Sequence, residues 1–161
     1  MNILQTKRIL GVLALAGLMA GCGKPYKAAT PDGFIDLSDR YESAENDEYR
    51  AATADGVVLG IRAYKNEPKV EMGVAIQALE NRVRLGQGYA LIAEKDVTAR
   101  DGTKGKMLQF GHDEPRGPHL YYVTLFITPK RVFVLEAGGK KDLVEAAEKS
   151  IDWSISNFYP E

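Results

Sequence analysis

Alternation of hydrophobic and polar positions is the first signal along this chain, and it predicts several β-strands. The clearest alternation is at 120–127, where Tyr121, Val123, Leu125 and Ile127 share one face and Tyr122, Thr124 and Phe126 share the other. In the stretch 57–64, the residues Val57, Leu59, Ile61 and Ala63 share one face, with Arg62 and Tyr64 on the other. Further strands are predicted at 34–37, 49–53, 89–99, 106–111 and 131–137. Asp55-Gly56 and Asp101-Gly102 are typical of tight turns between antiparallel strands.

Two segments change to a spacing of three and four residues, which predicts amphipathic helices. The apolar positions of the first are Met72, Ala75, Ile76, Leu79 and Val83. Gly86 and Gly88 follow, and glycine at this place favours the end of a helix. The apolar positions of the second are Leu143, Val144, Ala147, Ile151, Ile155 and Phe158. Asp142 with Glu145 predicts a capping box at the start of this single helix, which ends before Pro160.

Polar and glycine-rich stretches are predicted to connect these elements. The segment 38–48 is acidic and 112–118 is rich in glycine and proline, so both are predicted to be loops. Residues 138–140 could hold an anion, but they lack the spacing of a phosphate loop, so a flexible connection is favoured. Trp153, Phe158 and Tyr159 form either an exposed contact patch or a seal between the last helix and the sheet, and the seal is favoured.

Strands in two blocks, with one helix between them and one after them, predict an α+β domain. Its antiparallel β-sheet has about six to seven strands and is covered by two helices. This order of elements resembles the PsbP-like or MOG-like fold group, an α/β/α sandwich, over roughly residues 33–159. The resemblance rests on 88–91 leading into 105–110, and on 131–135 before the last helix. It implies binding to other proteins, such as photosystem subunits or a small GTPase, and it implies no shared catalytic site.

The first 22 residues follow a different pattern. Lys7 and Arg8 precede an apolar run at 9–20, which is too short for a membrane-spanning helix of about 20 residues. The run ends in the sequence LMAGC at 18–22, which resembles the lipobox of bacterial lipoproteins. The resemblance implies cleavage between Gly21 and Cys22 and acylation of Cys22, the only cysteine of the chain. The alternative is an ordinary secretory signal whose end happens to contain a cysteine.

These features predict a signal peptide at 1–21, a lipidated N-terminus and tether at 22–33, and a single α+β domain at 34–161. Lipoproteins carry several acyl chains on the cysteine, and several chains give durable membrane anchoring where one chain does not. The predicted location is therefore the bacterial cell envelope, with the membrane bound through the lipid on Cys22. Gly23 stands where a retention signal would have aspartate, which favours the periplasmic face of the outer membrane in a Gram-negative cell.

The charge of the mature chain excludes some partners. Cleavage removes Lys7 and Arg8 and leaves 19 basic and 22 acidic side chains, a formal charge of −3. This is not the basic excess that binding to nucleic acid or to an anionic lipid surface requires, so no nucleic-acid partner is predicted. No disulfide can form within the monomer, so the stability of the domain must come from packing.

Both histidines of the chain lie in the segment 111–119 together with two carboxylates. His112, Asp113 or Glu114, and His119 are candidate ligands for a divalent metal such as zinc. Their spacing matches no established metal motif, so a solvated hairpin loop is the favoured interpretation. The acidic stretch from Asp36 to Glu48 also lacks the spacing of a calcium loop. No cofactor is predicted.

Two classes of function follow from the sequence. The first is a non-enzymatic, membrane-anchored envelope lipoprotein whose domain binds a protein partner through a sheet face or a loop. It rests on the resemblance and on the lack of nucleophile-elbow and zinc-protease motifs. The alternative is an envelope domain that binds a small ligand or a metal ion, or an enzyme of an unrecognised kind, which would need a concave pocket with convergent polar groups.

Overall fold

The computed structural model describes residues 24–38 and 48–161. The predicted signal peptide, its cleavage site and Cys22 lie outside these residues, as does most of the acidic segment 38–48. The strands are β1 (Tyr26–Lys27), β2 (Ile35–Asp36), β3 (Tyr49–Ala52), β4 (Val58–Lys65), β5 (Ala90–Thr98), β6 (Lys104–Glu114), β7 (Gly117–Ile127), β8 (Arg131–Lys140) and β9 (Tyr159–Pro160). The helices are α1 (Met72–Gln87), α2 (Lys141–Ala146) and α3 (Glu148–Asn157).

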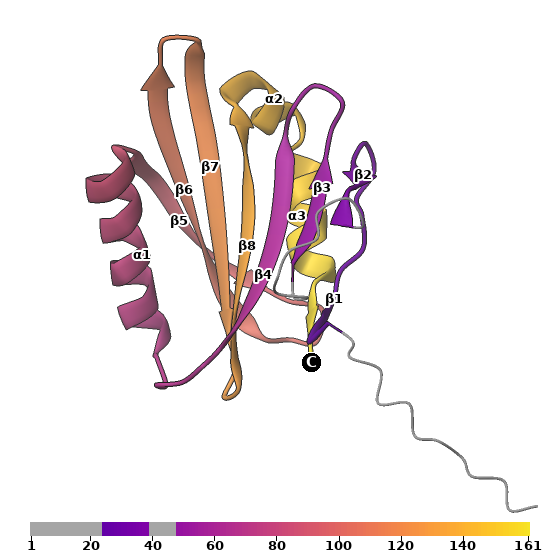
Figure 1. Cartoon of the computed structure of the whole chain (residues 1–161), viewed down its shortest axis with the longest axis vertical. Coiled ribbons are helices and arrows are strands. Elements are labelled where there is room, and N and C mark those ends of the chain that lie inside the picture. The colour runs from indigo at the N-terminus through magenta and orange to yellow at the C-terminus, as the bar shows by residue number, and fades with distance from the viewer. Residues whose placement is uncertain (1–23, 39–47) are drawn as a thin grey trace, which may run out of the picture.

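Seven of these strands form one antiparallel sheet in the order β2-β3-β4-β8-β7-β6-β5. Strands β1 and β9 form a separate antiparallel pair. Helix α1 lies on one face of the large sheet, and α2 and α3 lie on the other (Figure 1). The predicted α+β class, with helices covering an antiparallel sheet of about seven strands, is confirmed.

The two faces of the sheet carry separate hydrophobic cores, and the alternation of the sequence accounts for both. The core between the sheet and α2 and α3 contains Leu59, Ile61, Tyr122, Phe126 and Phe133 of the sheet with Ile151 and Phe158 from α3 and its C-cap, among others. The core between α1 and the sheet contains Val83 of α1 and Leu108, Phe110, Val123 and Leu125 of the sheet. Neighbouring residues of β7 therefore point into different cores, as the predicted alternation at 120–127 requires. The predicted buried face of β4 is confirmed in the same way.

Helix α1 ends as its sequence predicts. Gly88 has a φ of 74°, and its N–H donates to the carbonyl of Arg84, while the N–H of Tyr89 donates to the carbonyl of Val83. A left-handed residue at this position satisfies carbonyls at the end of the helix that would otherwise lack partners. Glycine adopts this conformation without the steric penalty of a Cβ atom. The turn leads the chain directly into Tyr89.

The predicted loop at 112–118 is wrong. Strand β6 continues to Glu114 and β7 starts at Gly117, so that only two residues form the turn. Pro118 lies within β7 opposite Asp113, but the pairing of β7 with β8 begins only at His119. Proline is tolerated there because β8 does not pair with this residue, so the missing N–H removes no hydrogen bond between β7 and β8. The glycine and proline content of 112–118 therefore predicted a longer loop than the two-residue turn that the structure contains.

The predicted flexible connection at 138–140 is also wrong, because these residues belong to β8. Gly138 pairs with both Val58 and Tyr121. A Cβ atom on Gly139 would lie 3.2 Å from the carbonyl oxygen of Gly56 and 3.5 Å from Val144. Glycine suits this position because a Cβ atom would be crowded by the neighbouring chains, rather than because the segment is flexible.

The single helix predicted at the C-terminal end is divided into α2 and α3. The division is at Ala147, whose φ and ψ are −90° and 0°. The predicted capping box is absent: the N-cap position of α2 is Lys140, with no side-chain hydrogen bond. The seal is confirmed for Phe158, which is fully buried, but is wrong for Trp153 and Tyr159, which remain 43% and 39% exposed.

The fold begins earlier than the predicted boundary at residue 34. Tyr26 is only 4% exposed and its ring packs against those of Phe133 and Phe158. The backbone of β1 pairs with β9, and Thr30 accepts a hydrogen bond from the Tyr49 hydroxyl at 2.8 Å. Residues from Tyr26 onward are therefore part of the folded unit. The tether predicted at 22–33 can be no longer than the residues that precede Tyr26.

Candidate functional site

The face of the sheet that carries α1 is only partly covered. Helix α1 packs against β5, β6 and β7. A helix about 10 Å wide covers roughly two strands spaced about 4.8 Å apart, so one helix cannot cover a seven-stranded sheet. On β4, Val58 and Tyr64 are 44% and 43% exposed, whereas Leu59 and Ile61, which point to the other face, are 6% and 3% exposed.

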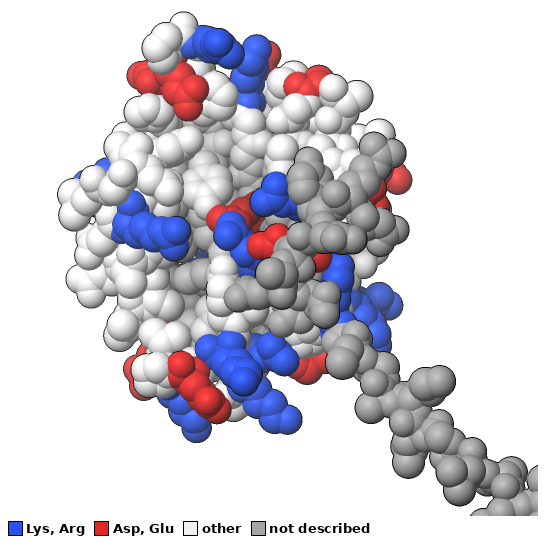
Figure 2. All heavy atoms as spheres, viewed as in Figure 1, with Lys and Arg blue, Asp and Glu red and all other residues white. Residues whose placement is uncertain are grey.

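A groove lies between α1 and the uncovered strands, and we call it the α1 groove. It consists of two hollows of ≈ 570 Å³ and ≈ 330 Å³ that share Tyr89, Tyr121 and Glu136 in their walls. Its polar and aromatic lining comprises Arg50, Arg62, Tyr64, Arg82, Gln87, Tyr89, His119, Tyr121 and Glu136. Figure 2 shows basic and acidic side chains side by side at the centre of this face.

The floor of the α1 groove is built around one carboxylate. Glu136 on β8 forms an ion pair with Arg62 on β4 and accepts a hydrogen bond from the hydroxyl of Tyr121 on β7. The three side chains converge because β8 lies between β4 and β7 in the sheet. One carboxylate thus fixes an arginine and a tyrosine from two neighbouring strands.

The electrostatics of this floor follow from these contacts. The hydrogen bond from Arg62 to Glu136 is the main cause that raises the pKa of Arg62. Burial, and then the hydrogen bond to Glu136, raise the pKa of Tyr121 well above its ordinary value. Arg62 therefore stays charged and Tyr121 stays protonated at neutral pH, so both remain hydrogen-bond donors.

The walls of the groove add more aromatic and cationic groups. Tyr89 packs against His112 and Tyr121, with ring centroids 5.0 Å and 5.9 Å apart. Arg82 on α1 is exposed and has no ion pair among the residues that the structure describes. The lining carries three arginines, three tyrosines and one glutamate. Tyrosine and arginine are the residue types most enriched in the energetic centres of protein interfaces.

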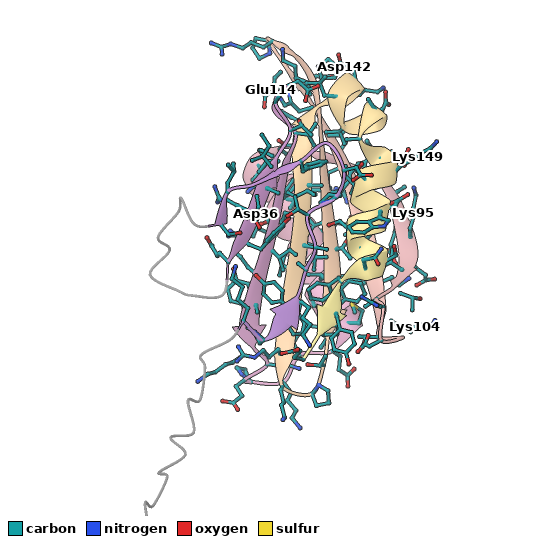
Figure 3. The ribbon with its side chains drawn as sticks, turned by 90° about the vertical axis from the view of Figure 1, so that its right-hand side faces the viewer. Asp36, Lys95, Lys104, Glu114, Asp142 and Lys149 are labelled. Atoms are coloured by element: carbon teal, nitrogen blue, oxygen red, sulfur yellow. The ribbon has the colours of Figure 1, made fainter. Side chains whose placement is uncertain are left out.

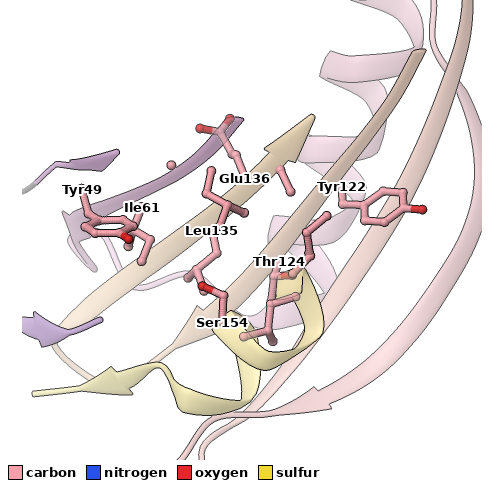
Figure 4. Close-up of a pocket in the computed structure, with 12 residues that line it drawn as sticks. Tyr49, Ile61, Tyr122, Thr124, Leu135, Glu136 and Ser154 are labelled. Carbon is pink, nitrogen blue, oxygen red and sulfur yellow. The ribbon is translucent and has the colours of Figure 1, made fainter. Parts of the chain in front are cut away.

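The second candidate is an interior hollow beneath α3. Figure 3 shows α3 lying along the sheet, and Figure 4 shows Tyr49, Ile61, Thr124, Leu135 and Ser154 around the space between them. Its free volume is ≈ 10 Å³, which is near the lower limit for a single water molecule. The hollow is a packing feature of the core and is too small for a ligand.

The four candidate metal ligands do not gather into one site, although the Nδ1 atom of His119 lies 3.6 Å from Oε2 of Glu114. His112 and His119 face each other across β6 and β7, but Asp113 lies on the opposite side of the pleat. The Nδ1 atoms of the two histidines lie 3.1 Å and 3.0 Å from the backbone oxygens of Gly88 and Gly117. Within 24–38 and 48–161, the structure contains no group of three or more His, Cys, Asp and Glu side chains placed to hold a metal ion.

Sequence reasoning overlooked most of the groove, although part of the signal was present. Arg62 and Tyr64 were predicted on the face of their strand opposite the apolar one, where the structure places them. Glu136 is the one acidic residue in the apolar stretch 131–137, which is a usable signal for a polar group on a sheet face. Arg82, Tyr89 and Tyr121 had no such signal, because only the packing of α1 brings them beside Glu136.

Comparison with known proteins gives matches in fold but not in sequence. No protein-family model matches the chain, and no curated protein matches it. The Ran-binding protein Mog1p of Saccharomyces cerevisiae matches with a TM-score of 0.57 and 11% identity, over 84% of this chain and 90% of that one. The cyanobacterial PsbP of Synechocystis sp. PCC 6803 matches with a TM-score of 0.55 and 14% identity, over 85% and 87%.

A third match is LpqN, which is involved in cell envelope biogenesis of Mycobacterium tuberculosis. Its TM-score is 0.53 at 14% identity, over 84% of this chain and 83% of that one. The chain has a PsbP-like and Mog1-like fold. At such low identities the likeness establishes the architecture and assigns no residue a role. Among the described residues, no helix is long and apolar enough to cross a membrane.

Proposed function

We propose that this chain is a bacterial envelope lipoprotein whose domain is a non-enzymatic module that binds a protein partner. Signal peptidase would remove residues 1–21, and acyl chains on Cys22 would anchor the mature protein, at the periplasmic face of the outer membrane in a Gram-negative cell. The lipobox-like run at 18–22 supports the anchor. The fold is shared with LpqN, which is involved in cell envelope biogenesis, and this supports the envelope location. It is also shared with Mog1p, a Ran-binding protein, which supports the binding role.

The observation that carries the binding role is the α1 groove. It combines an uncovered sheet face with three tyrosines and three arginines, and Glu136 holds Arg62 and Tyr121 in place. Side chains that are fixed before binding lose less conformational entropy when a partner docks. The groove is therefore suited to a partner that presents hydrogen-bond acceptors and negative charge.

Site-specific photocrosslinking in intact cells tests this role. Ala78 lines the groove, whereas its neighbour Gln77 is exposed on the same helix and does not line it. A photoreactive amino acid at 78 should crosslink to one protein, identified by mass spectrometry, and the same probe at 77 should not. A lack of protein product at 78, or the same products from both positions, would contradict the proposed role.

The anchor has its own test. The variant Cys22→Ala should lose membrane retention, because no other residue can take the thioether-linked lipid. Flotation of membranes in a density gradient measures this, and mass spectrometry of the native protein should show an acylated cysteine as the first residue. A variant that still floats with membranes would rule out the lipid anchor.

A second candidate function is the binding of a small ligand. It is favoured by the size of the α1 groove, since ≈ 570 Å³ lies within the roughly 300–1,000 Å³ typical of ligand pockets. Native mass spectrometry of the protein purified from its own membranes separates the two candidates. A stoichiometric small molecule, lost on substitution of Arg82, would favour the ligand. A spectrum of the protein without a bound small molecule, together with crosslinking at 78, would favour the partner.

A further inference from the structure

The two ends of the domain carry opposite charge. One end, which we call the basic end, comprises 24–27, 65–71, 99–104, 128–131 and 159–161. Its basic side chains are Lys24, Lys27, Lys65, Lys69, Arg100, Lys104, Lys130 and Arg131, and its acidic ones are Glu67, Glu71, Asp101 and Glu161. Within these described segments, eight basic and four acidic side chains sum to a net charge of +4.

Strand register shows that these segments share one end of the sheet. Lys65 pairs with Arg131, Thr98 pairs with Lys104, and the N–H of Asn66 donates to the carbonyl of Lys130 at 2.9 Å. The N–H of Arg100 donates to the carbonyl of Phe158, and the N–H of Glu161 donates to that of Pro25, both at 2.9 Å. The second bond ties the start of the described chain to its C-terminus at this end (Figure 1).

The other end of the domain has the opposite sign. It comprises 53–57, 86–90, 112–118 and 139–145. Its charged residues are the acids Asp55, Asp113, Glu114, Asp142 and Glu145 and the bases Arg116, Lys140 and Lys141. The net charge there is −2. Figure 3 shows this separation, with Lys104 at the lower end and Glu114 and Asp142 at the upper end.

The predicted acylation site is joined to the basic end. Only Gly23 separates Cys22 from Lys24, so the two Cα atoms are at most roughly 7–8 Å apart. A thioether-linked lipid places Cys22 at the headgroup level of the bilayer. Screening at physiological salt extends over about 8 Å, so Lys24 lies within reach of charged headgroups however the domain turns. Only one orientation brings the other cations there too.

We infer that the basic end docks on anionic phospholipid headgroups and holds the domain upright on its membrane. This inference rests on the proposed lipid anchor but not on the role of the α1 groove. Each Lys or Arg near an anionic membrane surface favours contact by a factor of about five. The lipid supplies attachment, and the charges supply orientation. The acidic end and the turn between β6 and β7 then point away from the bilayer.

Fluorescence quenching in vesicles tests this orientation with the lipidated full-length protein. Pro129 and Pro115 are exposed prolines in the turns at the basic and acidic ends. Each is replaced by cysteine and labelled with bimane, which is selective because acylation consumes Cys22. The vesicles contain phosphatidylethanolamine and phosphatidylglycerol at 3:1 with a trace of lipid spin-labelled at the headgroup. Quenching is expected at 129 and not at 115.

Charge dependence separates docking from simple tethering. Neutralisation by Lys65→Gln, Lys69→Gln and Lys104→Gln together should lower the docking equilibrium roughly a hundredfold, at about fivefold per charge. Quenching at 129 should also fall when neutral phosphatidylcholine replaces phosphatidylglycerol, or when the salt concentration rises to 0.5 M. The matched triple variant Arg116→Gln, Lys140→Gln and Lys141→Gln at the acidic end should change quenching less than twofold.

The outcomes distinguish this inference from the proposed function. Protein that does not remain on vesicles at all would contradict the lipid anchor itself. Protein that stays anchored but is quenched equally at 129 and 115, or whose quenching at 129 ignores lipid charge, would overturn the docked orientation alone. Loss of quenching at 129 only in the basic-end triple variant supports it.

Discussion

The two faces of the sheet use their side chains in different ways. On the face covered by α2 and α3, most side chains are apolar and almost inaccessible, and the ring of Phe158 stacks on Phe126 and meets Phe133 edge-on. On the face that α1 covers only in part, Arg62, Glu136 and Tyr121 hold one another in a half-open groove. Polar groups remain there because their partners, rather than a hydrophobic contact, satisfy them. The covered face supplies buried apolar contacts, and the partly covered face carries the groove that we propose as the binding site.

Removal of one aromatic side chain from the covered face should have the largest effect. Phe158→Ala is expected to lower the free energy of unfolding by about 3–5 kcal/mol, because a fully buried ring leaves a cavity. Urea denaturation measures this change. Trp153→Ala, at the 43% exposed position of α3, is the control and should cost less than about 1 kcal/mol. Equal losses in the two variants would contradict the assignment of the core.

A change to the floor of the α1 groove should cost less. Glu136→Gln is expected to lower the free energy of unfolding by about 1–2 kcal/mol, because Arg62 and Tyr121 lose a charged acceptor. The matched change Glu94→Gln removes an exposed ion pair with Lys106 and should cost less than about 0.5 kcal/mol. If the control costs as much as Glu136→Gln, the floor of the groove is not a structural unit.

Charge reversal on the wall of the groove should affect binding and leave stability nearly unchanged. Arg82→Glu is expected to reduce crosslinking from position 78 about tenfold, the effect of one lost charged hydrogen bond. Arg84→Glu on the same helix alters the exposed pair with Glu80 and should leave crosslinking within twofold. The same loss in both variants would show that general charge, rather than the groove, determines binding.

The partly buried Tyr121 should make the stability of the domain depend on pH. The folded protein raises the pKa of Tyr121, so it holds the phenolic proton more tightly than the unfolded chain does. The resulting stabilisation is complete below the unfolded value near 10 and is lost as the pH rises above it. Tyr121→Phe should therefore make the alkaline loss of melting temperature less steep above pH 10. An unchanged slope would mean that Tyr121 titrates normally.

The facing histidines should have the smallest effect. The double variant His112→Ala and His119→Ala is expected to change the free energy of unfolding by less than about 1 kcal/mol. A chelator should leave the melting temperature of the wild type unchanged, because the candidate ligands do not converge. A marked fall on chelation would show that a metal ion contributes to the fold after all.

Much of the fold was predictable because its signals are local. Alternation identified the buried face of β4 and both faces of β7, and Gly88 identified the end of α1. The errors arose where a local signal had a non-local cause. Gly139 was interpreted as part of a flexible connection, but it lies in β8, where the carbonyl oxygen of Gly56 is 3.2 Å from the position that a Cβ atom would take. Tyr26 was assigned to a tether because nothing near it in sequence shows that Phe133 and Phe158 cover it.

The sequence by itself determined the elements, the two apolar faces and the lipobox-like run before the only cysteine, because each depends on neighbours a few residues away. Only the tertiary structure decided which strands α1 leaves uncovered and which charges meet. Arg62 and Glu136 are 74 residues apart, and they meet because β4 pairs with β8. The basic end likewise gathers its cations from turns scattered along the chain. A chain of nearly neutral composition therefore has two ends of opposite charge. Net charge sums over the whole chain, whereas a membrane interacts only with the end that faces it.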